Sequence, residues 1–307
     1  MRKMCLQKIF ELAKIDKRVF FIGSDLGFET LKEFRQEIPE RFFMEGISEA
    51  HVIGMAAGLA LEGKVTYVNT IATFISRRAF EQIAVDVCMH NVPVRMIGNG
   101  GGLVYAPLGS THLALEDISL MRTLPNMTIV CPADADEMAR FMSQTLDYPG
   151  PIYIRLAKGY DPIVSKEEYG FEIGKGIHYK TGCDALLVTT GITLQIAVLA
   201  AQQLKEIGID TGILHLHTVK PLDHVQLLDL CQEVAAIVTI EENMLNGGLG
   251  SAVAECLAEA NFNRVKKFKR IGIPDIFPDF YGSQAEIMQR LGISPGGVVE
   301  TIRQLLR

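Results

Sequence analysis

The stretch FMEGISEAHVIGMAAGLA (43–60) is followed closely by the run VTYVNT (65–70). Ser48 can cap a helix that begins near Glu49, and the small residues that crowd this helix allow another backbone to approach closely. The run that follows is short, apolar and rich in β-branched residues, as in a strand. A helix followed at once by a buried strand is typical of an α/β fold.

The same alternation continues along the whole chain. Further apolar runs are VFFIGS (19–24), VPVRMIG (92–98), MTIVCP (127–132), ALLVTTG (185–191), GILHLHTV (212–219) and AAIVTI (235–240). Because these runs do not alternate strictly between apolar and polar residues, they predict parallel strands covered by helices on both faces. The sequence therefore indicates an α/β protein with doubly wound sheets.

The length and one break in the pattern predict two domains. The chain has 307 residues, and a domain usually takes roughly 150. The pattern lapses in KGYDPIVSKEEYGFEIGKGIHYKTG (158–182), which is rich in Gly, Lys and Glu. We therefore expect a first domain over 1–157, a linker over 158–182 that contains a short strand or two, and a second domain over 183–307.

Composition excludes several classes of protein. A net charge of −6 argues against nucleic acid or an anionic membrane as the main partner. The N-terminal segment mixes charges into its apolar residues, unlike a secretory signal, and no stretch is long and apolar enough to span a bilayer. The six cysteines are scattered without a CxxC pair, so we expect no disulfide framework or zinc site, and a cytoplasmic location.

An ordered set of motifs surrounds the opening stretch. In chain order they are Gly23-Ser24-Asp25-Leu26, Glu49 with its small-residue helix, Thr73-Phe74, Gly98-Asn99-Gly100-Gly101-Gly102, Gly109-Ser110-Thr111-His112, Pro125-Asn126-Met127, Glu241-Glu242-Asn243 and Asn246-Gly247-Gly248-Leu249-Gly250. In this order and spacing the chain resembles transketolases and deoxyxylulose-phosphate synthases, both thiamine-diphosphate enzymes, over nearly its whole length. The resemblance implies a pyrimidine-binding domain followed by a Rossmann-like transketolase C-terminal domain.

The resemblance also assigns roles to side chains around the cofactor. Glu49 matches the glutamate that hydrogen-bonds a ring nitrogen of the aminopyrimidine and so supports general base catalysis. Phe74 matches the aromatic residue that stacks on the pyrimidine. Outside this context Glu49 would be read as an ordinary first-turn helix acid and Phe74 as an ordinary core residue.

Four further residues match substrate or cofactor positions. His112 matches a histidine that faces the reacting carbonyl, although a surface-loop histidine is the plain alternative. Asp25 matches an aspartate close to the thiazolium, with a turn-capping role as the equal alternative. Arg155 and Arg2 match arginines that grip substrate phosphate, and a guanidinium suits a phosphate or sulfonate.

Two kinds of departure qualify the resemblance. Glu29, Gly100 and Leu108 fall where transketolases place a phosphate-binding serine, a histidine and a sugar-reading aspartate, so the usual pentose-phosphate substrates are in doubt. The chain also has no Gly-Asp-Gly, the motif that begins the family's Mg²⁺ and diphosphate site. Thiamine diphosphate is therefore expected at a junction with an N-terminal diphosphate-binding subunit that holds Mg²⁺, in an α2β2 heterotetramer.

The expected activity is transfer of a two-carbon ketol unit from a ketose phosphate or sulfonate to an aldose. A decarboxylating thiamine enzyme, either synthase-like or a 2-oxoacid dehydrogenase beta subunit, stays open, as does a non-catalytic regulatory subunit. Two other patterns are given structural interpretations. The near-fingerprint that begins at Gly248 is interpreted as a loop-to-helix turn, and His215 with His217 as a strand-edge or interface pair rather than a metal site.

Overall fold

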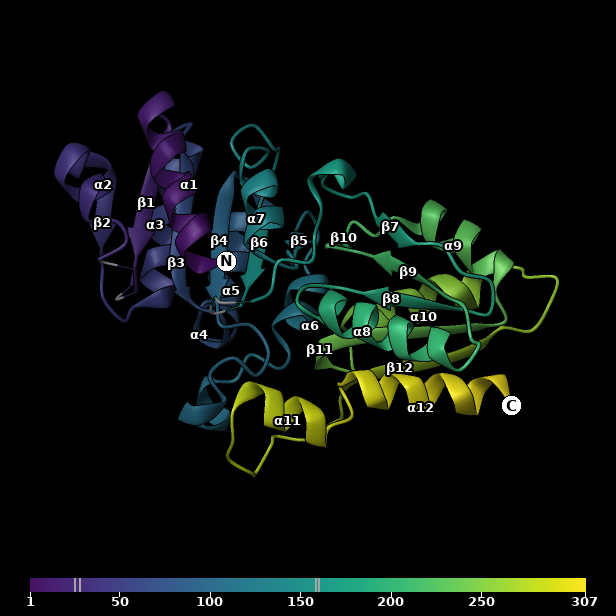
Figure 1. Cartoon of the computed structure of the whole chain (residues 1–307). Helices are drawn as coiled ribbons and strands as arrows, with labels where there is room; N and C mark the ends of the chain where they lie inside the picture. Colours follow the sequence, from purple (N-terminus) through teal and green to yellow (C-terminus); the bar gives the residue numbers. More distant parts are fainter. Residues whose placement is uncertain (25, 28, 158, 160) are drawn as a thin grey trace.

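The computed structural model describes residues 1–307 apart from 25, 28, 158 and 160, and its strands form two sheets (Figure 1). The first sheet has the order β10-β5-β6-β4-β3-β1-β2. Its strands are β1 (Val19–Gly23), β2 (Phe42–Met44), β3 (Val65–Ile71), β4 (Val94–Asn99), β5 (Thr128–Val130), β6 (Ile152–Leu156) and β10 (Thr218–Lys220). All neighbours in this sheet pair in parallel except β10 and β5.

Helices cover both faces of the first sheet. They are α1 (Arg2–Ile15), α2 (Lys32–Glu37), α3 (Glu49–Leu61), α4 (Ala72–Arg78), α5 (Phe80–Gln82), α6 (Asp117–Arg122) and α7 (Ala135–Met142). Successive strand residues belong to different apolar clusters: Phe21 packs with α1 and α7, whereas Ile22 packs with α3 and α4. Two buried faces explain why the strand runs lack strict alternation.

The second sheet has the order β12-β11-β8-β9-β7. Its strands are β7 (Ile177–Lys180), β8 (Ala185–Thr189), β9 (Thr211–His215), β11 (Ala236–Met244) and β12 (Lys267–Ile273), and its helices are α8 (Thr193–Glu206), α9 (His224–Glu233), α10 (Leu249–Glu259), α11 (Gln284–Arg290) and α12 (Pro295–Leu306). The pairs are parallel except β7 with β9. β7 comes from the segment predicted as a linker, so that segment adds an edge strand to the second sheet.

The run 212–219, predicted as one strand, is two strands in different sheets. β9 ends at His215, and β10 crosses over to pair with β5 in the first sheet. The amide of Cys131 donates to the carbonyl of His217 at 2.7 Å, which continues this pairing. The prediction of one strand was wrong because an apolar, β-branched run does not reveal where the backbone changes sheets.

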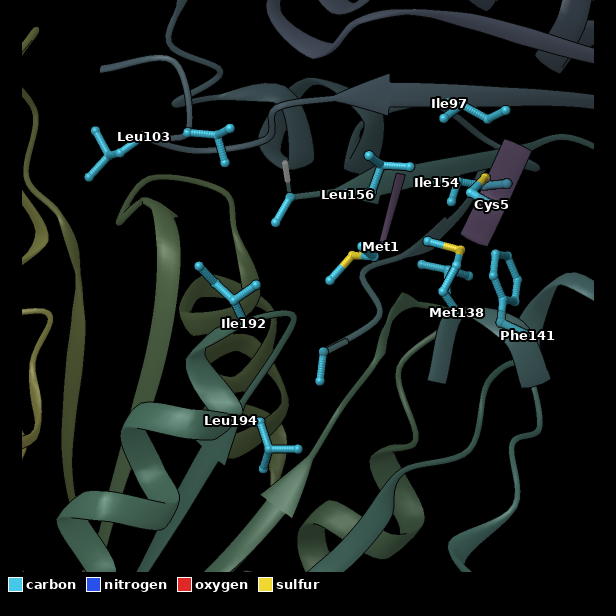
Figure 2. Packing of buried hydrophobic residues seen from close by; sticks show 14 of the residues in the cluster. Met1, Cys5, Ile97, Leu103, Met138, Phe141, Ile154, Leu156, Ile192 and Leu194 are labelled. Carbon is cyan, nitrogen blue, oxygen red and sulfur yellow. The ribbon is translucent and has the colours of Figure 1, made fainter. Parts of the chain in front are cut away.

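One apolar cluster continues from the first domain into the second. Figure 2 shows Leu156 at the end of β6 near Ile192 and Leu194 at the start of α8, and all three side chains are buried in the same cluster. Burial of apolar surface at such a contact stabilises the pair of domains. None of the helices among the described residues combines the length and apolar character that a bilayer crossing requires.

Candidate functional site

Glu49 is placed by the start of α3. Its side chain is only 4% exposed, and the positive end of the helix dipole favours a carboxylate at this position. Ser48 is the residue before the helix, but its hydroxyl donates to the carbonyl of Glu45 at 2.9 Å and makes no capping hydrogen bond. The expectation that the Ser48 side chain caps the helix was therefore wrong.

Phe74 and Arg78 lie one helical turn apart on α4, next to Glu49. The Arg78 Nη1 donates to both carboxylate oxygens of Glu49, at 3.3 and 3.2 Å. The carbon at the centre of the same guanidinium lies 3.9 Å from the centroid of the Phe74 ring, within range of a cation–π interaction. Side chains at i and i+4 share a helix face, so α4 presents both groups to the start of α3.

His112 completes this cluster from a third segment. Its ring centroid lies 5.2 Å from that of Phe74, with the ring planes at 63°. The short 3-10 turn Ser110–His112 carries it, and the Ser110 hydroxyl donates to the carbonyl of Pro278 in the second domain. Glu49, Phe74, Arg78 and His112, together called the half-site below, thus come from segments far apart in the sequence.

The glycine-rich loop before His112 is held by the second domain. Gly100 and Gly102 have φ angles of +72° and +66°, which favour glycine. A Cβ at Gly102 would lie 2.5 Å from the carboxyl carbon of Glu242. That carboxylate accepts from the Leu103 amide at 2.7 Å and from the Gln284 Nε2 at 2.8 Å. Burial raises the pKa of Glu242 to about 7.

Arg155 has protein partners in place of the expected substrate anion. Its side chain is 8% exposed, and Asp117 is fully buried. The Arg155 Nε and Nη2 donate to the two Asp117 oxygens at 2.8 and 3.0 Å, and Nη2 also donates to the carbonyls of Ala114 and Glu242. This guanidinium joins β6 to α6 and β11, and with these partners in place it is not available to a phosphate.

The other predicted positions are more dispersed. Arg2 is the first residue of α1, on the face of the first sheet opposite to α3 and α4. Asp25 lies outside the described residues. Glu29 is exposed, Gly100 is buried in the loop described above, and the Leu108 side chain is 56% exposed.

The two strand histidines lie at the junction of the domains, as an interface pair would. His215 Nε2 is 3.2 Å from Glu137 Oε2 on α7, and both side chains are fully buried. The His217 ring stacks on Phe171 with centroids 3.8 Å apart, and burial lowers the pKa of His217 to about 4. These side chains link the first domain, the segment between the domains and the second domain.

The near-fingerprint at Gly248 is the turn that begins α10. The Glu241 carboxylate accepts from the amides of Leu249 and Gly250 at 2.7 and 2.8 Å. A helix N-terminus is where a nucleotide phosphate would bind, and here the chain's own carboxylate takes that position.

Sequence reasoning missed Arg78, Asp117 and the contacts of Glu242. Arg78 could have been found from its i, i+4 spacing to Phe74 on a predicted helix. Asp117 carried no comparable signal, because its partner Arg155 is distant in sequence and the contact depends on the tertiary fold.

Comparisons with known proteins agree with this architecture. The transketolase pyrimidine-binding domain model matches residues 1–160, and the transketolase C-terminal domain model matches residues 174–298. The 6-deoxy-6-sulfo-D-fructose transketolase subunit SqwH of Clostridium sp. (strain MSTE9) is 33% identical, over 99% of this chain and 94% of that protein. An apulose-4-phosphate transketolase subunit of Phocaeicola vulgatus is 34% identical, over 100% and 97%.

A solved structure and a longer relative extend the comparison. A split-gene transketolase, solved as an inactive β4 tetramer, superposes with a TM-score of 0.89 at 32% identity, over 99% of this chain and 97% of that chain. The 1-deoxy-D-xylulose-5-phosphate synthase 1 of Geobacter sulfurreducens is 36% identical, and the match spans 46% of its length. The pyrimidine-binding model implies that the chain binds thiamine diphosphate. The chain belongs to the transketolase family, as the pyrimidine-binding and C-terminal domains of a split thiamine-diphosphate enzyme.

Proposed function

We propose that this chain is the subunit of a two-part transketolase that holds the cofactor's aminopyrimidine and moves a two-carbon ketol unit from a ketose phosphate or sulfonate to an aldose. The observation that carries the proposal is the meeting of Glu49, Phe74 and His112. These side chains come from α3, α4 and the turn after the glycine-rich loop, and Phe74 lies 5.2 Å from His112 between ring centroids.

The half-site fits an aminopyrimidine by a direct test. The flat guanidinium of Arg78 already stacks on Phe74 and donates to Glu49, so the pocket accepts a planar, nitrogen-bearing π group in that orientation. When bound, thiamine diphosphate supplies the acidic thiazolium carbon that makes ketol transfer feasible. Glu49 would hold a proton-sharing hydrogen bond to a ring nitrogen, and Phe74 would fix the ring plane.

His112 would serve the substrate side of the site. It is half-buried, and its Nδ1 lies 3.0 Å from the Thr111 hydroxyl. This contact orients the ring and leaves Nε2 to donate a hydrogen bond to a carbonyl oxygen or to carry a proton. Asp25 beside the thiazolium and Arg2 at the substrate anion remain part of the proposal on the strength of the family resemblance. Substrate contact by Arg155 would require it to leave Asp117.

The diphosphate and Mg²⁺ are assigned to a partner chain that carries Gly-Asp-Gly. Mg²⁺ requires hard oxygen ligands beside the diphosphate, and this sequence has no Gly-Asp-Gly. Two relatives carry names of transketolase subunits, and a structure related to this chain is an inactive tetramer of β chains. These relationships support an α2β2 assembly, located in the cytoplasm, in which this chain is the β subunit.

The substrate is proposed to be an anionic sugar outside the usual pentose-phosphate pair. The relatives are named for a sulfo-sugar and for a sugar phosphate, which both carry a terminal oxyanion. An acid at Glu29 would repel a dianion nearby, and Leu108 supplies no acceptor for a hydroxyl. Both residues are exposed, so they can take part in selecting among such sugars.

Reconstitution with the Gly-Asp-Gly subunit, thiamine diphosphate and Mg²⁺ tests the proposal. Ketol transfer is measured with wild-type chain, Glu49→Gln, and Glu45→Gln as the matched control. Loss of a proton-sharing carboxylate should lower kcat by about 10²- to 10⁴-fold. Glu45 lies before α3 and has His51 as its neighbour, at 3.8 Å, so its variant should retain activity. Wild-type turnover by Glu49→Gln would contradict the assignment.

A decarboxylating activity is the second candidate, favoured by the 36% identity to a deoxyxylulose-phosphate synthase. The reconstituted pair is given pyruvate or a ketose donor, and release of CO₂ is measured. Carbon dioxide from pyruvate would favour this alternative, whereas transfer from the ketose without CO₂ supports the transketolase. Absence of both activities, with no cofactor bound at the subunit junction, would favour a non-catalytic subunit.

A further inference from the structure

Arg78 makes the two contacts that the proposed cofactor ring needs. Its guanidinium stacks on the Phe74 ring at 3.9 Å and donates to both Glu49 oxygens. A guanidinium and a protonated or amino-substituted pyrimidine are alike in being flat, delocalised and edged with N–H groups. One ring face and one carboxylate cannot hold both groups in the same position.

The contacts of Arg78 are of a kind that can be given up. Its side chain is 48% exposed, whereas that of Glu49 is 4% exposed. The hydrogen bonds measure 3.2 and 3.3 Å, longer than is usual between a guanidinium and a carboxylate. Arg78 is also the last residue of α4, so its side chain can move toward solvent without breaking the helix. A half-exposed ion pair and an exposed cation–π contact are each weak.

We propose that Arg78 is a built-in competitor for the aminopyrimidine. Its guanidinium fills the half-site while the chain is without cofactor, and it leaves when the aminopyrimidine enters. This inference rests on the proposed function of Glu49 and Phe74. Arg78 thereby satisfies a buried carboxylate in the unassembled chain, which would otherwise lack a partner, and it sets a threshold that the cofactor must exceed.

The test measures binding of 4-amino-5-hydroxymethyl-2-methylpyrimidine, the aminopyrimidine half of the cofactor, to the full chain alone by ligand-observed NMR. Arg78→Ala should bind this probe about tenfold more tightly than the wild type, because the two weak contacts of the competitor are removed. Arg78→Lys keeps a cation for Glu49 but loses the flat stacking group, so its affinity should fall between the two.

Arg77→Ala is the matched control. Arg77 is on the same helix and carries the same charge, but its guanidinium pairs with Glu116, so its removal should leave probe affinity at the wild-type value. An equal gain in Arg77→Ala would show a general charge effect and overturn the proposal. Equal or weaker binding by Arg78→Ala than by wild type would overturn it as well.

Glu49→Gln separates this inference from the proposed function. If wild type and Arg78→Ala bind the probe equally, and Glu49→Gln loses binding, the pocket stands and the competitor role fails. If Arg78→Ala does not bind the probe at all, the competitor role fails together with the pocket. Tighter binding by Arg78→Ala that is lost again in the Glu49→Gln, Arg78→Ala double variant supports both.

Discussion

Two charged clusters in this molecule are built from similar side chains but differ in how firmly they are held. The interdomain cluster, defined as Arg155, Asp117 and Glu242, is at most 8% exposed, and its arginine has hydrogen bonds to a carboxylate and to two carbonyls. In the half-site the arginine is 48% exposed, and one nitrogen donates to the carboxylate at 3.2 and 3.3 Å.

The difference teaches where a charged pair supports the fold and where it can serve binding. Removing one partner of a buried pair leaves an unpaired charge without water, which costs several kcal/mol. Removing a partner from a half-exposed pair costs little, because solvent replaces it. Groups that must exchange partners during function are therefore better placed at a half-exposed site such as that of Arg78.

The largest expected effect is in the interdomain cluster. Arg155→Met removes the partner of the fully buried Asp117 and should lower the free energy of unfolding by about 3–5 kcal/mol. Urea denaturation of the full chain measures this loss. A loss below about 1 kcal/mol would mean that water reaches Asp117 and that the two clusters do not differ in the way described.

Glu242 gives a smaller effect that depends on pH. Because burial raises its pKa from 4.5 to about 7, the folded chain binds a proton more tightly than the unfolded chain between these pH values. The free energy of unfolding therefore decreases as pH rises through this window. Glu242→Gln keeps the acceptor oxygen but cannot ionise, so it should match the wild type near pH 4.5 and exceed it by about 1–3 kcal/mol at about pH 8.

Denaturation curves of Glu242→Gln and wild type at several pH values measure this difference. The neighbouring Glu241, whose pKa burial also raises to about 7, is unchanged in both chains and so cancels in the comparison. A gap that is constant with pH would show that Glu242 does not titrate in this range.

The smallest effect is expected at the half-site. Arg78→Met should change the free energy of unfolding by less than about 1 kcal/mol, because its ion pair is half-exposed and the methionine still packs on Phe74. Thermal unfolding beside Arg155→Met checks the contrast directly. A loss as large as that of Arg155→Met would show that the half-site arginine is structural and would count against its role as a competitor.

The sequence predicted the fold class and the meeting of Glu49, Phe74 and His112 better than it predicted the contacts of the arginines. Strand runs such as 19–24 and 65–70 are local signals, and the structure has strands there. The family resemblance brought three distant residues to one site. Arg155 was expected at a substrate anion because residue type alone does not distinguish a ligand-binding guanidinium from one paired with a buried aspartate.

The crossing of 212–219 between sheets was also beyond the sequence. Its composition is that of one strand, and only the pairing of Thr218 with Val130 reveals that β10 belongs to the first sheet. A contact between residues so far apart in sequence is decided by the tertiary fold, which local propensity does not describe.

The position of β10 has a consequence for biosynthesis. Chains leave the ribosome from the N-terminus at about 5–20 residues per second, and the first sheet receives its last edge strand, Thr218–Lys220, only after the chain has passed through β7, β8 and β9 of the second sheet. Until then β5 is an open edge, which is a template for pairing with other chains. A nascent chain that stalls in the segment between the domains would therefore expose this edge, and a gene divided there would produce an aggregation-prone first fragment.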